Sequence, residues 1–375
     1  MSGKTMSDSL HFVRRIRTSP YFNRVKAAGI SSFSVYNHML LPKTFAMSVE
    51  DAYWHLNTHV QIWDVSVQRQ VEIKGPDAAR LVQWITPRDL SQATPERCYY
   101  IPVVDQSGGM LNDPVLQMLD QDHYWLSIAD SDLLLYIKGL AIAGGFDVNV
   151  QEPDVNPLAI QGPKAADVMA DLFGEAIRSL TFFQATTIDI FGSKQRVTRS
   201  GFSAKAGYEI YLDDRSLAEP LWDMIQDAGQ PYQMAAGGPN LIDRMEAGLL
   251  GYGNEMTPEN NPLEMGYERF CTLDGSVDCI GLAALQRIQR DGIKRSIRGV
   301  KFDGAPCPPC SQPWPVTHQG QKIGQITSAV WSPRLQCNIG LSLIDRGYWN
   351  PGQEVDITLP QGDRVKGQVS HLPFD

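Results

Sequence analysis

Two segments of the chain repeat one order of apolar and polar positions. VEIKGPDAARLVQWIT spans residues 71–86 and LAIQGPKAADVMADLF spans residues 158–173. In each, a short apolar run stops at a Gly-Pro pair, and apolar residues then recur at helical spacing. Proline directly after glycine suits the first helical turn, so each segment predicts a strand that leads into a helix. The repeat therefore predicts two related α+β units.

The neighbouring segments extend these units. Residues 98–105, 108–120 and 123–130 predict successive strands, and residues 131–145 predict a helix with a Ser-Asp start. Residues 186–214 predict a hairpin and a further strand, and residues 216–229 and 240–256 predict helices, the second with a face that ends at Gly251 and Gly253. From about Ile293, short apolar runs are separated by Gly, Pro and Asn, which predicts a small all-β module, a barrel or a sandwich.

The strand GYEIYL, residues 207–212, carries polar groups on one face. Side chains alternate along a strand, so Gly207, Glu209 and Tyr211 share one face and Tyr208 and Ile210 share the other. A carboxylate can accept two parallel bonds from the N–H edge of a planar heterocycle such as a pterin. The alternative is an exposed strand face with an isolated glutamate, and the spacing leaves both interpretations open.

Asp113 lies in VVDQSGGMLNDPVLQMLD, residues 103–120, between a Gly-Gly turn and an alternating apolar run. Asn and Asp finish turns well because their side chains bond nearby backbone groups. The other interpretation is that the Asp113 carboxylate points at a bound molecule. The local pattern favours the turn.

Composition narrows the function classes. A chain of 375 residues exceeds the size of a typical single core, so two or three domains are expected. The formal net charge is −9, which is unlike the basic footprint of a nucleic-acid-binding protein. No apolar run is long enough to span a bilayer, and the first twenty residues lack the apolar core of a secretory signal. With only six scattered cysteines, a cytoplasmic protein without nucleic-acid or membrane partners is expected.

Other motifs give little support for metal or nucleotide chemistry. Cys307-Pro-Pro-Cys310 has the spacing of a redox pair or half a zinc site, but no second such pair follows. His55 and His59 have the spacing of a helical metal pair, but Leu56 stands where a zincin needs Glu. P-loop, dinucleotide-loop and nucleophile-elbow motifs are absent from the sequence. We expect no metal.

Aromatic residues occur in several segments near predicted turns. Aromatic rings usually pack in cores, but a group of rings is also the expected way to hold an onium ion. The residues are Tyr21, Tyr36, Tyr99, Tyr100, Phe183 and Phe202.

Five motifs resemble the glycine-cleavage T-protein (aminomethyltransferase) family, in the family's order: GGMLNDPVL, LAIQGPKA, RMEAGLLGYGNEM, NNPLEMGYE and IGQITSAVWSP. The resemblance covers nearly the whole chain. It implies an α+β fold, a three-domain cloverleaf of two related ferredoxin-like α+β units and a C-terminal β-barrel or jelly-roll-like domain. The expected limits are 1–54 and 152–256 for the first unit, 55–151 and 257–290 for the second, and 291–375 for the barrel.

The same resemblance implies tetrahydrofolate as cofactor, bound in the central opening. Asp113 matches the family's acidic residue near folate N5 and is the expected catalytic residue, so its carboxylate is expected to face the cofactor. The positions that match cofactor-binding residues are Glu209, Tyr211, Phe202, Arg244 and Tyr100.

Within the family, VYNHMLLP, LNDPV, WLSIADSD and KAGYEIY look most like members that demethylate dimethylsulfoniopropionate. This resemblance implies a small-molecule methyl donor and transfer of its methyl group to folate N5, with methylmercaptopropionate and 5-methyltetrahydrofolate as products. It gives Ser127, Tyr21 and Phe183 as expected donor contacts. A homodimer is compatible with it.

One position departs from the family's pattern. The T-protein usually has two adjacent acids where this chain has Asn112 and Asp113. A sulfonium methyl needs positioning more than acid–base help, so the asparagine is compatible with that donor. The alternatives are a demethylase for another onium or methyl-ether donor, an aminomethyltransferase, and a non-catalytic folate-binding protein of the same fold.

Overall fold

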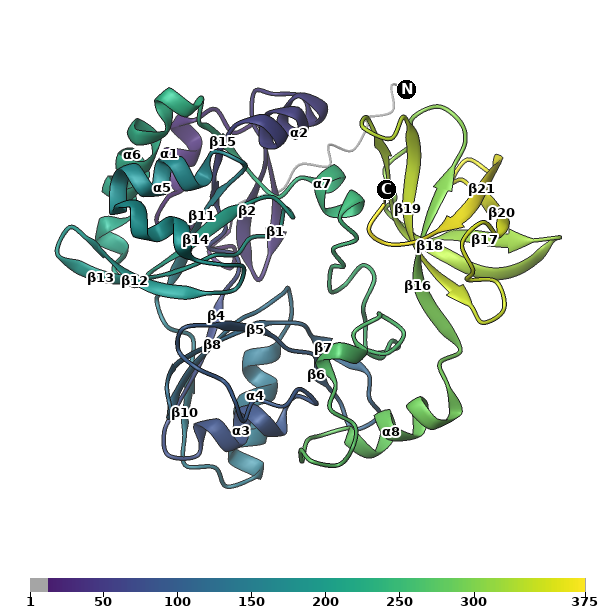
Figure 1. Cartoon of the computed structure of the whole chain (residues 1–375), viewed down its shortest axis with the longest axis horizontal. Coiled ribbons are helices and arrows are strands. Elements are labelled where there is room, and N and C mark those ends of the chain that lie inside the picture. Colours follow the sequence, from purple (N-terminus) through teal and green to yellow (C-terminus); the bar gives the residue numbers. More distant parts are fainter. Residues whose placement is uncertain (1–12, 375) are drawn as a thin grey trace, which may run out of the picture.

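The computed structural model describes residues 13–374. Three lobes surround a common centre, with α7 (Leu241–Glu246) between them (Figure 1). The expected fold class, two α+β units and a C-terminal barrel, is confirmed. Residues 1–12, part of the stretch expected to lack a secretory signal, lie outside the described residues. In the described chain no helix combines the length and apolarity needed to cross a membrane.

The first unit is built on a six-stranded sheet. Its strands are antiparallel except β15, which runs parallel to β3. Helices α1 (Phe22–Ala27), α5 (Ala165–Phe173) and α6 (Ala218–Gly229) contribute to the apolar core on one face of the sheet. The strand order is β12 (Ala185–Ile190), β13 (Ser193–Thr198), β14 (Gly207–Leu212), β11 (Asn156–Gln161), β3 (Gln61–Asp64) and β15 (Ala235–Gly237).

The second unit has a five-stranded antiparallel sheet. Helices α3 (Ala78–Trp84) and α4 (Leu133–Ala143) pack on its apolar face, and α8 (Leu282–Asp291) connects this lobe to the barrel (Figure 1). The strand order is β10 (Asn149–Gln151), β4 (Gln70–Lys74), β9 (His123–Ser127), β8 (Val115–Asp120) and β5 (Cys98–Tyr100).

Smaller elements complete the two units. The hairpins are β1 (Ser32–Tyr36) with β2 (Met39–Thr44) and β6 (Val103–Val104) with β7 (Met110–Asn112). Helix α2 (Val49–Thr58) lies beside α7, since Tyr53 donates to Glu246. The 3-10 turns are η1 (Glu175–Ser179), η2 (Arg215–Leu217), η3 (Gln230–Tyr232) and η4 (Glu268–Phe270).

The C-terminal lobe is a closed barrel. Its strand order is β16 (Arg295–Phe302), β19 (Cys337–Asp345), β18 (Gln321–Ser332), β17 (Trp314–His318), β20 (Glu354–Thr358) and β21 (Arg364–Ser370). The sequence patterns did not predict β17, because prolines surround it and Pro315 cannot donate to a ladder. The strand forms because its neighbours Trp314 and Val316 are buried in the barrel core.

The helix predicted over residues 240–256 is shorter than expected. Helix α7 ends at Glu246, and Gly248 follows with φ +67, in the left-handed region that glycine adopts without strain. The chain then turns, with the Leu249 amide donating to the Arg244 carbonyl oxygen. The apolar spacing after Gly248 therefore belongs to a packed loop.

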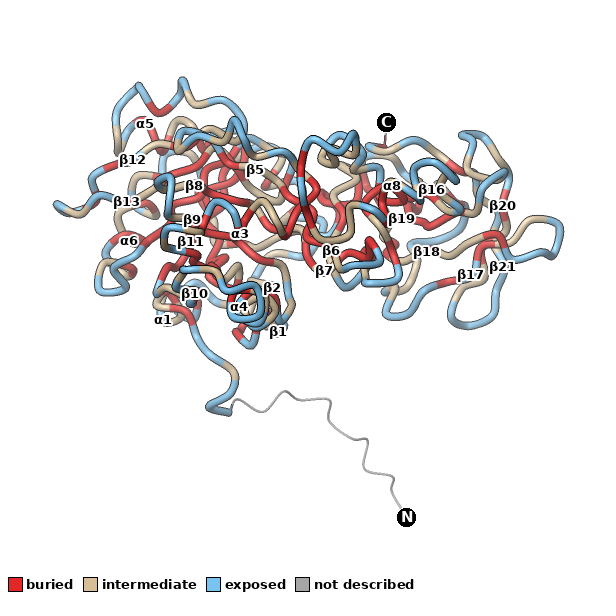
Figure 2. The backbone as a smooth tube through the Cα atoms, turned by 90° about the horizontal axis from the view of Figure 1, so that it is seen from below, coloured by how far each residue is buried: buried red, intermediate tan, exposed pale blue. Residues whose placement is uncertain are grey.

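Each α+β unit buries an apolar outer face under helices and turns a more polar inner face toward the other unit. Tyr208 and Ile210 lie in the helix-covered core of the first unit, as the alternation in GYEIYL predicts. Tyr211 instead packs with Trp125 of the second unit. Figure 2 shows buried backbone running through both sheets, with exposed segments mainly at the periphery.

The chain passes between the two sheets twice, through residues 65–69 after β3 and residues 152–155 before β11, and returns to the second unit after β15. Strand β3 lies within the range 55–151 expected for the second unit, but it pairs with β11 and β15 of the six-stranded sheet. The five-stranded sheet has its first strand at β4. The domain limits themselves stay a prediction.

Candidate active site

Glu209 and Tyr211 lie on the inner face of β14. Ser200 Oγ donates to Glu209 Oε2, and the Tyr211 hydroxyl lies 3.5 Å from the same oxygen. Burial raises the pKa of the Glu209 carboxyl, and the bonds from Ser200 and Tyr211 oppose this rise. Oε1 accepts no hydrogen bond from any described residue. This oxygen is free to accept hydrogen bonds from a ligand.

The facing sheet presents two amide side chains with incomplete hydrogen bonding. Gln70 Nε2 donates to Ser127 Oγ at 2.7 Å, and Gln117 Oε1 accepts from Arg196 Nε at 2.7 Å. Gln70 Oε1 and Gln117 Nε2 are buried and have no partner within residues 13–374. A buried polar atom without a partner is costly, and water or a ligand usually completes it. The layer between the sheets therefore has unfilled donor and acceptor positions.

Ser127 lies next to Tyr211 across this layer. Burial, and then the charge of Glu209, raises the pKa of Tyr211 well above its usual range, and hydrogen bonding with Ser127 and Thr198 lowers it in part. Ser127 is itself buried. The structure thus brings together Ser127, expected to contact the donor, and Glu209 and Tyr211, expected to contact the cofactor.

Asp113 lies just after β7 and accepts a 2.6 Å hydrogen bond from the Tyr100 hydroxyl at Oδ2. Burial raises the pKa of Asp113 to about 7, the Tyr100 bond acts against it, and the charge of Glu255 adds to it. The side chain nevertheless keeps a partly exposed surface. Asp113 is therefore enclosed by protein on most sides and open on one.

Aromatic rings surround this carboxylate. Burial, followed by the charge of Asp113, raises the pKa of Tyr36, Tyr252 and Tyr267. The Tyr100 ring lies 5.2 Å from the Tyr267 ring and 5.1 Å from the Phe270 ring, measured between centroids. A carboxylate within a group of electron-rich rings is an environment that favours a cation.

Strand β5 connects the Asp113 and Glu209 regions. Burial raises the pKa of Cys98 to about 12, and the nearby charges of Arg196 and Glu209 modify it in opposite directions. Cys98 and Tyr100 are two positions apart on one strand, so they share a face and lie about 7 Å apart along it. One end of this face is next to Glu209 and the other is bonded to Asp113.

Arg244 is held at the junction with the barrel. Its Nη1 bonds Glu255 Oε2 at 3.0 Å and the Leu249 carbonyl oxygen, and its Nη2 bonds Ser328 Oγ at 2.8 Å. Ser328 also donates to Glu255. Glu255 contributes to the raised pKa of Asp113, so this ion pair borders the Asp113 region.

The other three predicted site residues lie in different surroundings. Tyr21 is in the core of the first unit, beside Trp222, and its hydroxyl donates to the Asn156 carbonyl oxygen. Phe183 is half-buried and stacks on the exposed Phe182 ring at 4.3 Å. Phe202 is half-buried in the loop before β14 that also carries Ser200. No hydrogen bond or ring contact joins these three to one another among the described residues, and their roles stay predictions.

Gln70, Gln117 and Arg196 were not predicted from the sequence. Alternation in VLQMLD and SKQRVT places Gln117 and Arg196 on defined strand faces, but it does not show that the two faces meet. Their 2.7 Å contact joins strands of different sheets and so depends on packing between the units.

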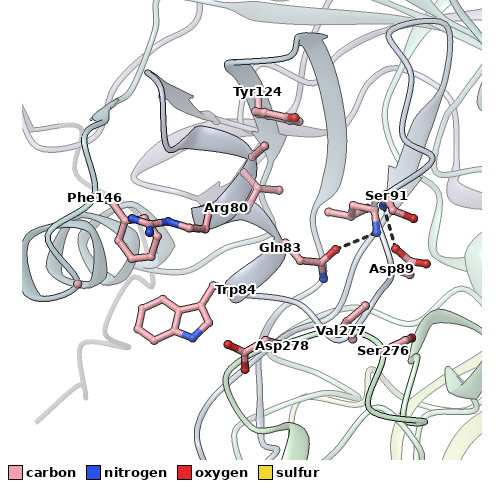
Figure 3. A pocket seen from close by; sticks show the side chains of 14 residues that line it. Arg80, Gln83, Trp84, Asp89, Ser91, Tyr124, Phe146, Ser276, Val277 and Asp278 are labelled. Carbon is pink, nitrogen blue, oxygen red and sulfur yellow. Dashed lines mark hydrogen bonds between the residues drawn. The ribbon is translucent and has the colours of Figure 1, made fainter.

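Other candidate features lie outside this region. A cavity of about 660 Å³ lies on the second unit beside α3, with Trp84, Phe146, Asp89 and Asp278 in its wall, and none of the predicted site residues lines it (Figure 3). Burial raises the pKa of Cys307 and of Cys310 to about 11, which disfavours the reactive thiolate at either sulfur. No group of three or more His, Cys, Asp or Glu residues suited to a metal occurs within residues 13–374.

These features define an α+β protein with unpartnered buried polar atoms between two facing sheets and a barrel beside the same centre. The GCVT N-terminal domain model matches residues 21–275, and the glycine cleavage T-protein C-terminal barrel domain model matches residues 295–375. The chain belongs to this family.

Individual relatives support the same placement. The chain is 47% identical over 351 residues to the dimethylsulfoniopropionate demethylase DmdA of Ruegeria pomeroyi, across 94% of this chain and 95% of that protein. It is 33% identical to the aminomethyltransferase of Alkaliphilus metalliredigens, across 85% of this chain and 87% of that protein. The crystal structure of aminomethyltransferase T from Bartonella henselae has the same fold, with a TM-score of 0.85 at 23% identity, covering 96% of this chain and 98% of that chain.

Proposed function

We propose that this protein is a tetrahydrofolate-dependent methyltransferase that demethylates dimethylsulfoniopropionate. The observation that carries the proposal is one face of the short strand β5. Glu209 of β14 lies near one end of this face, and Asp113 is bonded to Tyr100 at the other end. The 47% identity to the Ruegeria pomeroyi demethylase over almost the whole chain supports the choice of donor. The products are methylmercaptopropionate and 5-methyltetrahydrofolate.

The residues of the inter-sheet layer suit the cofactor. Glu209 Oε1 is free to accept from the N–H edge of a pterin, and the raised pKa of this carboxyl reflects a dry site in which such bonds are strong. The unpartnered Gln117 Nε2 and Gln70 Oε1 add a donor and an acceptor in the same layer. When bound, tetrahydrofolate would supply a nucleophilic N5 as methyl acceptor; the C–S bonding pair would stay on sulfur in the neutral thioether, and the N5 proton would pass to solvent.

Asp113 acts in this scheme by position and charge. With a pKa of about 7, a substantial fraction of Asp113 is ionised at neutral pH, and its negative field stabilises a sulfonium ion held nearby. Tyr100 fixes the carboxylate through Oδ2. In this proposal the tyrosine rings replace the hydration shell of the cation, and Ser127 holds the donor's carboxylate.

The structure of the Asn112 side chain argues against the aminomethyltransferase alternative. Asn112 is fully buried, its Nδ2 donates to the Ala129 carbonyl oxygen and to Ser131 Oγ, and its Oδ1 accepts from the Ala129 amide. These bonds hold the end of β7 against the loop after β9. The position is therefore structural, and Asp113 is the single carboxylate of the pair available for proton transfer.

A donor panel tests the proposal. Purified protein with tetrahydrofolate is expected to convert dimethylsulfoniopropionate to methylmercaptopropionate and 5-methyltetrahydrofolate in equal amounts, measured by mass spectrometry. A methyl-ether donor and an aminomethyl donor serve as comparisons. Turnover of either comparison with none of the sulfonium would refute the donor assignment, and folate binding without turnover of any donor would favour a non-catalytic role. A homodimer remains a further prediction, measured by light scattering.

A further inference from the structure

A separate cavity of about 410 Å³ lies where the chain crosses between the two α+β units. Ser66 and Arg69, of the first crossover, line it together with residues 152–155 of the second crossover and Asn156, the first residue of β11. Residues 16–18 and Arg215 close its other sides. The cavity is therefore built mainly from the segments that connect the two units, and it shares no residue with the predicted site.

The charges in its wall do not balance. Three arginines face two carboxylates, Glu152 and Asp154. Glu152 is shared, because Oε1 accepts from Arg17 at 2.8 Å and Oε2 accepts from Arg69. Asp154 lies 3.6 Å from Arg215 Nε, beyond hydrogen-bond distance, and accepts from Asn156 Nδ2. The wall keeps one excess positive charge, and Arg69 Nε has no hydrogen-bond partner among the described residues.

Arg69 carries the most specific signal. Its side chain is 14% exposed, and its Nε is buried with no hydrogen-bond partner among the described residues. A guanidinium carries five N–H donors, and a buried one without an acceptor is costly. Arg69 therefore keeps one unused donor in the wall of the cavity, beside its ion pair with Glu152.

We propose that this cavity binds a small oxyanion, a carboxylate or a phosphate, with Arg69 as its main ligand and Arg17 and Arg215 as additional donors. The planar guanidinium suits the oxygens of either group, and the cavity volume suits a small molecule. A bound oxyanion joins residues from both crossovers and from the N-terminal segment. It would therefore slow local opening of the two connecting segments.

The test uses the full-length protein without folate. Inorganic phosphate and acetate are titrated separately by calorimetry at an ionic strength held constant with sodium chloride. One saturable binding event is expected for at least one anion, and the anion that saturates identifies the source of the oxygens. Hydrogen exchange is expected to slow in residues 65–69 and 152–156 when that anion is bound.

Three variants locate the site. Arg69→Gln is expected to weaken anion binding about tenfold or more, because it removes a charged donor. Arg215→Gln is expected to weaken anion binding about threefold. The Arg215 side chain is 58% exposed, so its substitution should not disturb folding. Arg290→Gln is the matched control, since Arg290 is 73% exposed and lies elsewhere on α8. The proposal is overturned if neither anion saturates, or if Arg69→Gln and Arg215→Gln both bind like the control.

Discussion

Two buried polar regions of this protein differ in how fully their side chains are hydrogen-bonded within the protein. At the junction between α7 and the barrel, Arg244, Glu255 and Ser328 bond one another, and Glu246 accepts from Tyr53, Ser332 and Arg334. Between the two sheets, Glu209 Oε1, Gln70 Oε1 and Gln117 Nε2 have no hydrogen-bond partner among the described residues. The side chains named at the junction are bonded within the protein without a ligand, whereas the inter-sheet layer has buried polar atoms with no partner.

This difference separates a structural role from a binding role. A complete buried ion-pair network holds parts of the chain together, and removing one member leaves an uncompensated charge. An incomplete layer costs stability in the free protein, and a ligand that completes it recovers that cost on binding. Substitutions at the junction should therefore lower the free energy of unfolding, whereas substitutions in the inter-sheet layer should weaken ligand binding.

The largest effect is expected at the junction. Arg244→Met should lower the free energy of unfolding by about 3–5 kcal/mol, because Glu255 is then buried without its partner. Arg334→Met is the matched comparison, and its cost should be smaller, because Arg334 is 44% exposed and Glu246 keeps its bonds to Tyr53 and Ser332. Thermal unfolding measures both variants. An Arg244 variant of normal stability that fails to bind folate would place this residue in the ligand site instead.

A smaller effect is expected in the inter-sheet layer, and in binding rather than stability. Glu209→Ala should weaken tetrahydrofolate binding about 10- to 100-fold, the range for losing a charge-assisted bond, with little loss of stability. Glu264→Gln is a suitable control, since Glu264 is a buried carboxylate bonded to Arg295 beside the barrel. That control should lose stability and retain folate binding. Wild-type folate affinity in Glu209→Ala, measured by calorimetry, contradicts the assignment.

An effect of the same size as at Glu209, but on turnover, is expected at Asp113. Asp113→Asn keeps the shape and removes the charge, so turnover of dimethylsulfoniopropionate should fall about 10- to 100-fold, as for a positioning group. A loss beyond about 1000-fold with folate binding retained would make Asp113 an essential proton carrier.

The pH dependence of the same variant gives a second measurement. The pKa of Asp113 is raised from 3.8 to about 7, so its charge develops as pH rises through 7, and kcat/KM of the wild type should rise there. In Asp113→Asn this rise should disappear. Between about pH 4 and 7 the folded protein holds a proton that the unfolded chain releases, so this group lowers wild-type stability as pH rises. The variant should consequently melt at a higher temperature than the wild type at pH 8.

Local sequence patterns predicted which strand faces carry the site residues, but they did not predict how the two sheets meet. Alternation in GYEIYL correctly separated Glu209 and Tyr211 from the core residues Tyr208 and Ile210, because the side-chain period of a strand is a local property. The roles of individual residues came from the family resemblance and remain to be tested. The contact between Gln117 and Arg196 joins two sheets, and no local pattern encodes such a pairing.

The errors in the predicted elements have the same origin. Strand β17 was missed because Pro315 and its neighbouring prolines indicate a loop, whereas burial of Trp314 and Val316 keeps the segment in the barrel. Helix α7 was predicted too long because the apolar spacing continues past Gly248, which turns the chain. In both cases tertiary packing outweighed local preference.

The two crossings between the sheets also determine the order in which the sheets can form during synthesis on the ribosome. All strands of the five-stranded sheet lie within residues 70–151, so this sheet can form as soon as they have emerged. Strand β3 emerges earlier but pairs with β11 and β15, and it must wait with unpaired edges until residues 156–161 and 235–237 follow. Domains generally fold as units during translation, and unpaired edges favour aggregation. We therefore expect the five-stranded sheet to form first and β3 to keep unpaired edges until β11 has emerged.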